Sequence, residues 1–440
     1  MTKPIAKVGL LTAVAIVVAN MVGTGVFGSL GYQVLGLPSG FPIIALWVLG
    51  GSLSFCGAVC YAELASIFPR SGGEYHLLSE SWHPFVGFLA GWLSVTIGFA
   101  APIAANAALL GGYLHEITDY HRLYFAIPVV LLVALIHLGK LTHIGRFQNI
   151  FTYAKILLII VLGFLCFGLG SRQPISFLPI EGDWGLIRSE SFAVSLVFVL
   201  YAYTGWNAAT YMMDEVKQPE RNVPLALLIG TGFVTILYVF LNAAFLHATP
   251  IDSMAGEAEV GLIAAATVLG ERGGMIMGLL ISFGLISTIS SMTWAGPRVT
   301  SALGRDYQSL SFLNRLNRNG VPAIAILIQT AIVLLLVSTA TFDQLIYYIQ
   351  ALLTISSMMV VLAVIWLRIR RPDLKRAYRA WGFPVTPGLF LLINGYVLWY
   401  QIQNKPIEFL WGIGTLALGV VVYFVISSKG KKNAQATPAN

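Results

Sequence analysis

The stretch VVANMVGTGVFGSLGYQVLG, Val17–Gly36, lies in a long apolar run near the N-terminus but carries Gly23-Thr24-Gly25 at its centre. Glycine in a helix interior costs about 1 kcal/mol relative to alanine. Two glycines around a hydroxyl therefore predict a membrane helix that is interrupted here. The alternative is that these glycines are small-residue contacts where two helices approach closely.

Composition places the whole chain in a membrane. Of its 440 residues, 57% are hydrophobic and only 10% are charged, whereas soluble domains carry about 25% charged residues. The net charge of +7 comes from short loops between apolar runs, so we relate it to membrane orientation and expect no nucleic-acid partner. The three cysteines, Cys56, Cys60 and Cys166, lie in apolar runs. We expect no disulfide, metal or cofactor.

Twelve apolar segments are long enough to cross a bilayer, which takes roughly 20 residues each. They lie near residues 9–30, 41–68, 84–113, 123–139, 148–170, 190–213, 224–248, 260–297, 322–340, 344–368, 383–402 and 407–427. With the N-terminus inside, 20 of the 26 lysines and arginines fall on the cytoplasmic side, five fall outside, and Lys155 lies within a span. This bias predicts a multi-pass protein of the plasma (inner) membrane with both termini cytoplasmic.

The sixth span breaks its apolar pattern as the first one does. It reads SFAVSLVFVLYAYTGWNAATYMMDE, Ser191–Glu215, and is interrupted at Thr204-Gly205, with polar Asn207 close behind. Spans 1 and 6 are five apart, an odd number, so two five-helix units would have opposite orientations. Paired interruptions of this kind are typical of a transporter binding site. The units predicted are 1–170 (helices 1–5), 171–380 (helices 6–10), 381–428 (helices 11–12) and a disordered cytoplasmic tail, 429–440.

A broken helix suits one class of ligand. The half-helix that begins after a break presents N–H groups and a positive dipole end to a carboxylate. The half-helix that ends before the break presents carbonyls to an ammonium. A free α-amino acid carries both groups on one carbon, so the two breaks predict an amino acid site.

Four stretches resemble the amino acid–polyamine–organocation permeases, and within them the L-type amino acid transporter branch. They are VGTGVF (Val22–Phe27), YAELASIFPRSGGEYHLLSE (Tyr61–Glu80), YAYTGWNAATYMMDEVKQPERNVPLA (Tyr201–Ala226) and, more weakly, RRPDLKRAYRAWGFPVTP (Arg370–Pro387). The resemblance covers nearly the whole chain. It implies an all-α membrane protein of twelve transmembrane helices, with a LeuT-type 5+5 inverted repeat and broken helices 1 and 6.

The resemblance also implies which residues contact the substrate. The expected set is Asn20, Met21, Gly23, Thr24, Gly25, Tyr201, Thr204 and Asn207. Tyr201 stands where the family often has an aromatic lid, although a packing aromatic would look the same. The alternative to substrate contact for Asn207 is a hydrogen bond between helices. The sequence departs from the branch at Ala19-Asn20, where Gly-Thr is expected, so Asn20 affects the side-chain preference.

Lys155 lies about 10 Å into the fifth span, counted from Gln148 at 1.5 Å per residue. One interpretation of Lys155 is a side chain that extends along the helix to place its charge among the lipid headgroups. The other is a site that takes part in the mechanism. By resemblance, its ammonium replaces the sodium ion that joins helix 1 to helix 8 in sodium-coupled relatives. Its expected partners are carbonyls between Ala19 and Val22 and a hydroxyl of helix 8, with Thr288 favoured. Glu63 is a gating or coupling candidate, or else part of an interfacial salt bridge.

The function that follows is sodium-independent secondary transport of neutral L-amino acids across the lipid bilayer, by exchange or proton coupling. No acidic side chain is evident at the breaks, which speaks against cationic substrates. A permease for cationic amino acids, amines or polyamines is the alternative. An enzyme is not expected, because no catalytic cluster lies at membrane depth, and a channel lacks a ring of charges or carbonyls. The resemblance implies that some members of the family bind an accessory chain through an extracellular cysteine. None of the three cysteines here lies in an outside loop, so no obligatory accessory subunit is expected.

Overall fold

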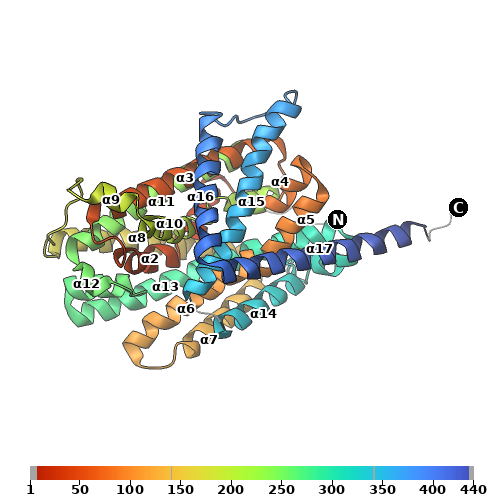
Figure 1. Cartoon of the computed structure of the whole chain (residues 1–440). Helices are drawn as coiled ribbons and strands as arrows, with labels where there is room; N and C mark the ends of the chain where they lie inside the picture. Colours follow the sequence, from red (N-terminus) through yellow and green to blue (C-terminus); the bar gives the residue numbers. More distant parts are fainter. Residues whose placement is uncertain (1–6, 140, 340–341, 436–440) are drawn as a thin grey trace.

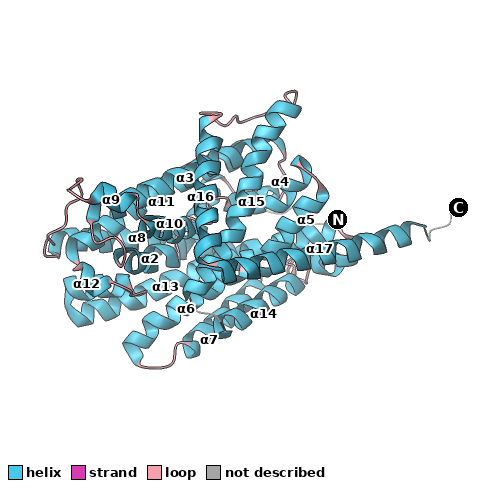
Figure 2. Ribbon diagram, viewed as in Figure 1, coloured by secondary structure: helices cyan, strands magenta, loops and turns pink. Residues whose placement is uncertain are grey.

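The computed structural model describes residues 7–139, 141–339 and 342–435, with the side chains of 141–147, 342–345 and 428–435 left out. Helices joined by loops make up this part of the chain, as Figure 2 shows. The only pairing between extended segments among the described residues is one parallel bridge, Val8 to Val216. The all-α prediction is confirmed.

Nine helical segments within the described ranges are long and apolar enough to cross a membrane. They are Leu10–Val34, Gly40–Ile67, Pro84–Thr118, Gln148–Leu169, Pro219–Ala248, Val260–Asp306, Ile346–Arg370, Val385–Asn404 and Pro406–Ser427. Three shorter apolar helices, Leu123–His137, Glu190–Ala202 and Ala323–Thr339, occupy the other predicted positions.

The helices carry the labels of Figure 1. In chain order they are α1 (Leu10–Met21), α2 (Thr24–Val34), α3 (Gly40–Ile67), α4 (Glu74–Ser81), α5 (Pro84–Leu93), η1 (Ser94–Gly98), α6 (Ala100–Thr118), α7 (Leu123–His137), α8 (Leu141–Leu169), α9 (Asp183–Ile187), α10 (Glu190–Ala202), η2 (Ala208–Glu215), α11 (Pro219–Ala248), α12 (Ile251–Met254), α13 (Val260–Asp306), η3 (Gln308–Asn314), α14 (Ala323–Thr339), α15 (Phe342–Arg370), α16 (Val385–Asn404) and α17 (Pro406–Gln435).

Both predicted interruptions are present. The first apolar segment divides into α1 and α2, with Val22 extended and Gly23 between them. The sixth divides into α10 and the 3-10 helix η2. A third irregularity was not predicted: the segment from Pro84 to Thr118 contains the π-helical turn η1, a feature frequent at functional sites.

The breaks lie in the middle of the bundle. The α1 helix packs against α11 and α13, and α10 packs against α2 and α3. In Figure 1, α9 and α12 lie at one end of the bundle, whereas α4 and α5 lie at the other. The outer helix α17 runs past the body to Gln435, so the chain is helical beyond the predicted start of the tail at Lys429. Residues 436–440 of that tail lie outside the described residues.

Candidate functional site

The break between α1 and α2 is held by close contacts. A Cβ on Gly23 would lie 2.9 Å from both Asn106 Oδ1 and Thr288 Cγ2, so only glycine fits without movement. The Thr24 N–H, at the start of the second half-helix, donates to Asn106 Oδ1 (3.2 Å). Before the break, the Met21 carbonyl accepts from the Tyr238 hydroxyl (2.6 Å). Backbone groups that the break frees therefore have protein partners, as the low-dielectric interior requires.

The break after α10 lies directly against the first one. Gly205 has φ +96°, a region that favours glycine, and a Cβ there would lie 2.8 Å from the Asn20 carbonyl oxygen. In the same way, a Cβ on Gly25 would lie 2.2 Å from Ala202 Cα. The glycines of both breaks thus serve close helix packing, which was the alternative considered from the sequence. They also bring the two interrupted backbones together.

Lys155 is buried and joins the first break to α13. Its Nζ donates to the Ala19 carbonyl (2.9 Å), the Val22 carbonyl (2.6 Å) and Thr288 Oγ1 (3.0 Å). Thr288 Oγ1 in turn donates to the Val22 carbonyl (2.6 Å). The expected contacts are present, and the ammonium lies inside the protein rather than at a headgroup. Lys155 therefore does not snorkel in this conformation.

A small cavity of about 60 Å³ opens where the breaks meet. Its lining consists of Asn20, Glu74, Gly98, Phe99, Pro102, Thr204, Gly205, Trp206, Asn207, Tyr211, Met292, Leu353 and Ser357. It has room for a few water molecules at most. An amino acid would enter only if the surrounding helices moved apart.

The residues expected to contact a substrate divide into two groups. Asn20, Thr204 and Asn207 line the cavity. The other expected residues, Met21, Gly23, Thr24, Gly25 and Tyr201, are buried but do not belong to its lining. Among them, the Tyr201 hydroxyl lies 3.3 Å from Thr24 Oγ1 and links the two broken helices.

The charged residue of this lining was not predicted from the sequence. Glu74, the first residue of α4, is buried and reaches the cavity, where it accepts a hydrogen bond from Asn207 Nδ2. The expectation that no acidic side chain lies near the breaks is therefore wrong. Glu74 follows the two glycines of PRSGGE, and the sequence pattern gave no measure of how deeply this loop folds into the bundle.

Glu63 forms a buried ionic cluster. Its Oε2 accepts from Arg368 Nη2 (2.5 Å) and from the Ala380 N–H (2.7 Å), and its Oε1 accepts from Arg376 Nε (3.0 Å). Glu63 belongs to α3, whereas its partners lie at the end of α15 and in the loop before α16. The salt bridge that was one of the two alternatives for Glu63 is present, and it ties α3 to the α15–α16 connection.

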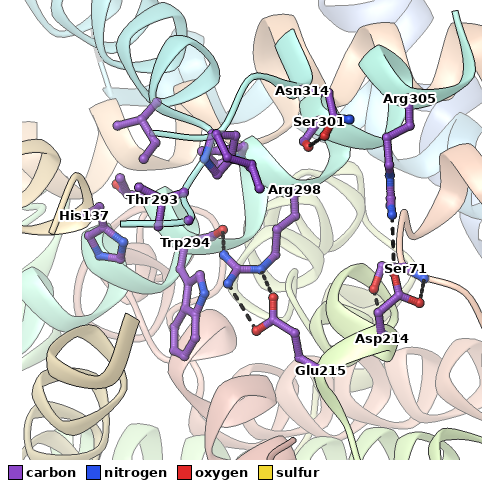
Figure 3. Close-up of a pocket in the computed structure, with 16 residues that line it drawn as sticks. Ser71, His137, Asp214, Glu215, Thr293, Trp294, Arg298, Ser301, Arg305 and Asn314 are labelled. Atoms are coloured by element: carbon purple, nitrogen blue, oxygen red, sulfur yellow. Dashed lines mark hydrogen bonds and ion pairs between the residues drawn. The ribbon is translucent and has the colours of Figure 1, made fainter. Parts of the chain in front are cut away.

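A second cavity, of about 210 Å³, lies at the end of η2 and is drawn in Figure 3. Glu215 pairs with Arg298 through two hydrogen bonds, of 2.6 and 3.1 Å, and Asp214 accepts from the Ser71 N–H (3.3 Å). Arg305 lies 3.8 Å from Asp214. These pairs join η2 to α13.

Comparison with known proteins covers nearly the whole chain. The family model described as amino acid permease matches residues 8–427. The mouse (Mus musculus) b(0,+)-type amino acid transporter 1 is 26% identical over 435 residues, 95% of this chain and 87% of the relative. The serine/threonine exchanger SteT of Bacillus subtilis is 28% identical over 400 residues, 89% of this chain and 90% of the relative. The rabbit (Oryctolagus cuniculus) large neutral amino acids transporter small subunit 2 is 26% identical over 437 residues, 95% and 80% of the respective chains.

These relatives are transporters and not enzymes, in agreement with the resemblance drawn from the sequence. The match extends from the residues before α1 into α17 and includes both broken helices, Lys155 and the cavity lining. The chain is a multi-pass membrane protein that belongs to the amino acid permease family of the amino acid–polyamine–organocation superfamily.

Proposed function

We propose that this permease is a sodium-independent secondary transporter of neutral L-amino acids, which works by exchange or proton coupling around the cavity between the two breaks. The observation that carries the proposal is the Lys155 ammonium on the Ala19 and Val22 carbonyls and on Thr288 Oγ1. Carbonyl and hydroxyl oxygens are the ligands that a small hard cation would use. With a fixed ammonium among them, the site needs no sodium ion.

The proposed architecture is twelve transmembrane helices with a LeuT-type inverted repeat. Contacts that such a repeat would relate occur in matched pairs. The α1 helix contacts α11, and α10 contacts α3; α6 contacts α14, and α13 contacts α7; α6 contacts α15, and α13 contacts α8. The predicted unit boundary at 170/171 falls just after the end of α8, and 380/381 falls between α15 and α16.

The substrate would bind with its carboxylate and ammonium on the broken backbones. We assign this role to Asn20, Met21, Gly23, Thr24, Gly25, Tyr201, Thr204 and Asn207. Because the amides and carbonyls of α1 and α2 now bond to Asn106 and Tyr238, a substrate would replace these internal partners when the cavity opens. The exchanger and neutral amino acid relatives support a substrate of this class.

The second candidate is transport of cationic amino acids or amines, and Glu74 favours it because a carboxylate lines the cavity. We prefer neutral substrates, since three protein donors already satisfy this carboxylate. Glu63 is proposed as a gating residue of the cytoplasmic side because it ties α3 to the end of α15.

We further propose that the protein lies in the plasma (inner) membrane with both termini cytoplasmic, and that it works without an accessory chain. All three cysteines lie within α3 and α8, so none of them is placed in a loop for a link to a partner. If the detergent-solubilised protein purifies as a single chain and retains transport after reconstitution, the proposal is supported. Transport that occurs only when a second chain is present would refute it.

Counterflow tests the substrate class. Proteoliposomes are loaded with one unlabelled amino acid per batch, in sodium-free medium, and entry of labelled leucine is followed. Accumulation that depends on loading with neutral amino acids supports the proposal. Accumulation of labelled lysine or of a labelled diamine, with no accumulation of labelled leucine under any loading, would replace it by the second candidate.

A further inference from the structure

Glu74 reaches the cavity because of the two glycines before it. Gly72 and Gly73 have φ values of +139° and +55°, and a Cβ on Gly73 would lie 2.1 Å from the Tyr211 ring. The Gly73 N–H donates to the Thr210 carbonyl (3.2 Å). The loop between α3 and α4 is thereby fixed directly onto η2, and α4 begins with its first side chain inside the bundle.

The carboxylate of Glu74 accepts three hydrogen bonds from neutral groups. Its Oε1 accepts from the Tyr61 hydroxyl (3.1 Å) and from Asn207 Nδ2, and its Oε2 accepts from the Tyr211 hydroxyl (2.7 Å). Tyr61 comes from α3, whereas Asn207 and Tyr211 belong to the segment after the second break. Glu74 thus connects that segment to α3.

Glu74 forms no ion pair with a basic side chain in the described part of the chain. The titratable groups that face it are Tyr61 on α3 and Tyr211 on η2, and the cavity lining contributed by α6, α13 and α15 is uncharged. Burial raises the pKa of Glu74 and the three donors lower it, with burial the larger cause. Its charge therefore depends on local hydrogen bonds rather than on a fixed counterion.

Asn207 has its amide orientation set by this arrangement. Its Nδ2 donates to Glu74 and to the Tyr211 hydroxyl (3.0 Å), which uses both of its N–H groups. An ionised carboxylate only accepts hydrogen bonds, so it can pair with the NH₂ of the amide and not with its oxygen. Asn207 is a residue of the cavity lining, and its side-chain oxygen is then left as an acceptor for a ligand that donates.

We propose that Glu74 is a positioning residue of the transport site: its carboxylate fixes the Asn207 amide so that the amide oxygen accepts from the substrate ammonium. This inference rests on the proposed function, since it deepens the role assigned to Asn207. A neutral group at position 74 can donate as well as accept, so the Asn207 amide loses its single orientation.

The variant that tests the proposal is Glu74→Gln, which keeps the shape and removes the charge. We expect a rise of about tenfold in the KM for the amino acid, the effect of one misplaced hydrogen bond, with the maximal rate changed less than about twofold. Glu74→Asp should retain part of the affinity, because it keeps an acceptor. Glu80→Gln is the matched control: it is the same change on the same helix, at an exposed residue, and it should leave the KM unchanged.

A double variant separates positioning from a direct role. If Glu74 acts through Asn207, then Glu74→Gln adds nothing to the KM of Asn207→Ala. If the two substitutions raise the KM independently, so that their factors multiply in the double variant, the proposal is overturned. A pH profile gives a third readout: substrate affinity of the wild-type protein should fall as acid protonates Glu74, and that of Glu74→Gln should not. Equal pH profiles would also overturn it.

The tests run in parallel with labelled leucine and labelled lysine. If only lysine is carried, the neutral substrate class fails, and the Glu74 series is read with lysine. If neither is carried, the proposed function fails. The thermal stability of the two single variants and of the double variant is then compared instead. Coupled losses there still support the contact on which positioning depends, and independent losses overturn it.

Discussion

At Lys155 a single ammonium joins the first broken helix to α13 through three oxygen acceptors. Removal of the amine would leave the Ala19 and Val22 carbonyls buried, each short of one donor, at a cost of about 1–3 kcal/mol per group. We expect Lys155→Met to lower sodium-free counterflow at least tenfold. Lys405→Met, at a partly exposed residue between α16 and α17, is the control and should retain transport. Wild-type rates in Lys155→Met would contradict the assignment.

Gly205 provides a second prediction at this scale. Its φ of +96° disfavours any side chain, and a Cβ would meet the backbone of Asn20 at 2.8 Å. We expect Gly205→Ala to destabilise the protein by at least about 1–2 kcal/mol and to lower the melting temperature in detergent. Gly414→Ala is the control, because a Cβ at Gly414 meets nothing within 4 Å. Equal melting temperatures would show that the second break tolerates a side chain.

His76 predicts a pH dependence of stability. It lies on α4 in the connection between two spans, and burial lowers its pKa from 6.5 to about 4. The folded protein therefore binds this proton less readily than the unfolded chain does. The free energy of unfolding therefore keeps its full value above pH 6.5 and decreases as the pH falls from 6.5 toward 4, because the unfolded chain gains the proton first. We expect thermal unfolding to shift down between pH 7 and pH 5, and His76→Gln to reduce that shift. If His76→Gln shows the same shift as the wild-type protein, other titratable groups cause the pH dependence.

At the scale of elements, the pairs at the end of η2 hold this segment to α13 (Figure 3). Glu215 and Arg298 are both largely buried, with side chains 14% and 16% exposed. Loss of this pair should favour opening of the adjoining cavity. We expect Glu215→Gln to raise thiol modification of Thr293→Cys about fivefold, the effect of roughly 1 kcal/mol. The experiment uses a variant with the three native cysteines replaced by alanine. No change in the modification rate would mean that the pair does not restrain η2.

The elements themselves were largely predictable. Apolar length located the spans, and glycine inside an apolar run located both breaks, because both signals are local. Span ends were predicted less well: the eighth was expected to stop at 297, whereas α13 continues to Asp306. The π-helical turn η1 carries no local signal. Lys155 was identified because a charge in an apolar run is conspicuous, whereas Glu74 lies in a polar loop, and only the tertiary fold places it in the cavity.

At the scale of the whole molecule, the two breaks, Lys155 and the cavity support the proposal of a carrier whose ion site is filled by its own side chain. The cavity of about 60 Å³ and the paired charges on η2 are consistent with a closed conformation, in which the helices must move apart before a substrate can bind. Alternating access would then be movement of the broken helices against their neighbours, with Lys155 retaining its contacts to the first break. The proposals on substrate class and on sodium independence rest on different residues, so each can be refuted without the other.

The most direct test is the initial rate of leucine counterflow in proteoliposomes, measured with sodium and again with choline in its place on both sides of the membrane. We predict equal rates in the two media for the wild-type protein, and a low rate in both for Lys155→Met. Leucine entry that requires sodium would contradict the account, because it would mean that the Lys155 ammonium does not replace the ion.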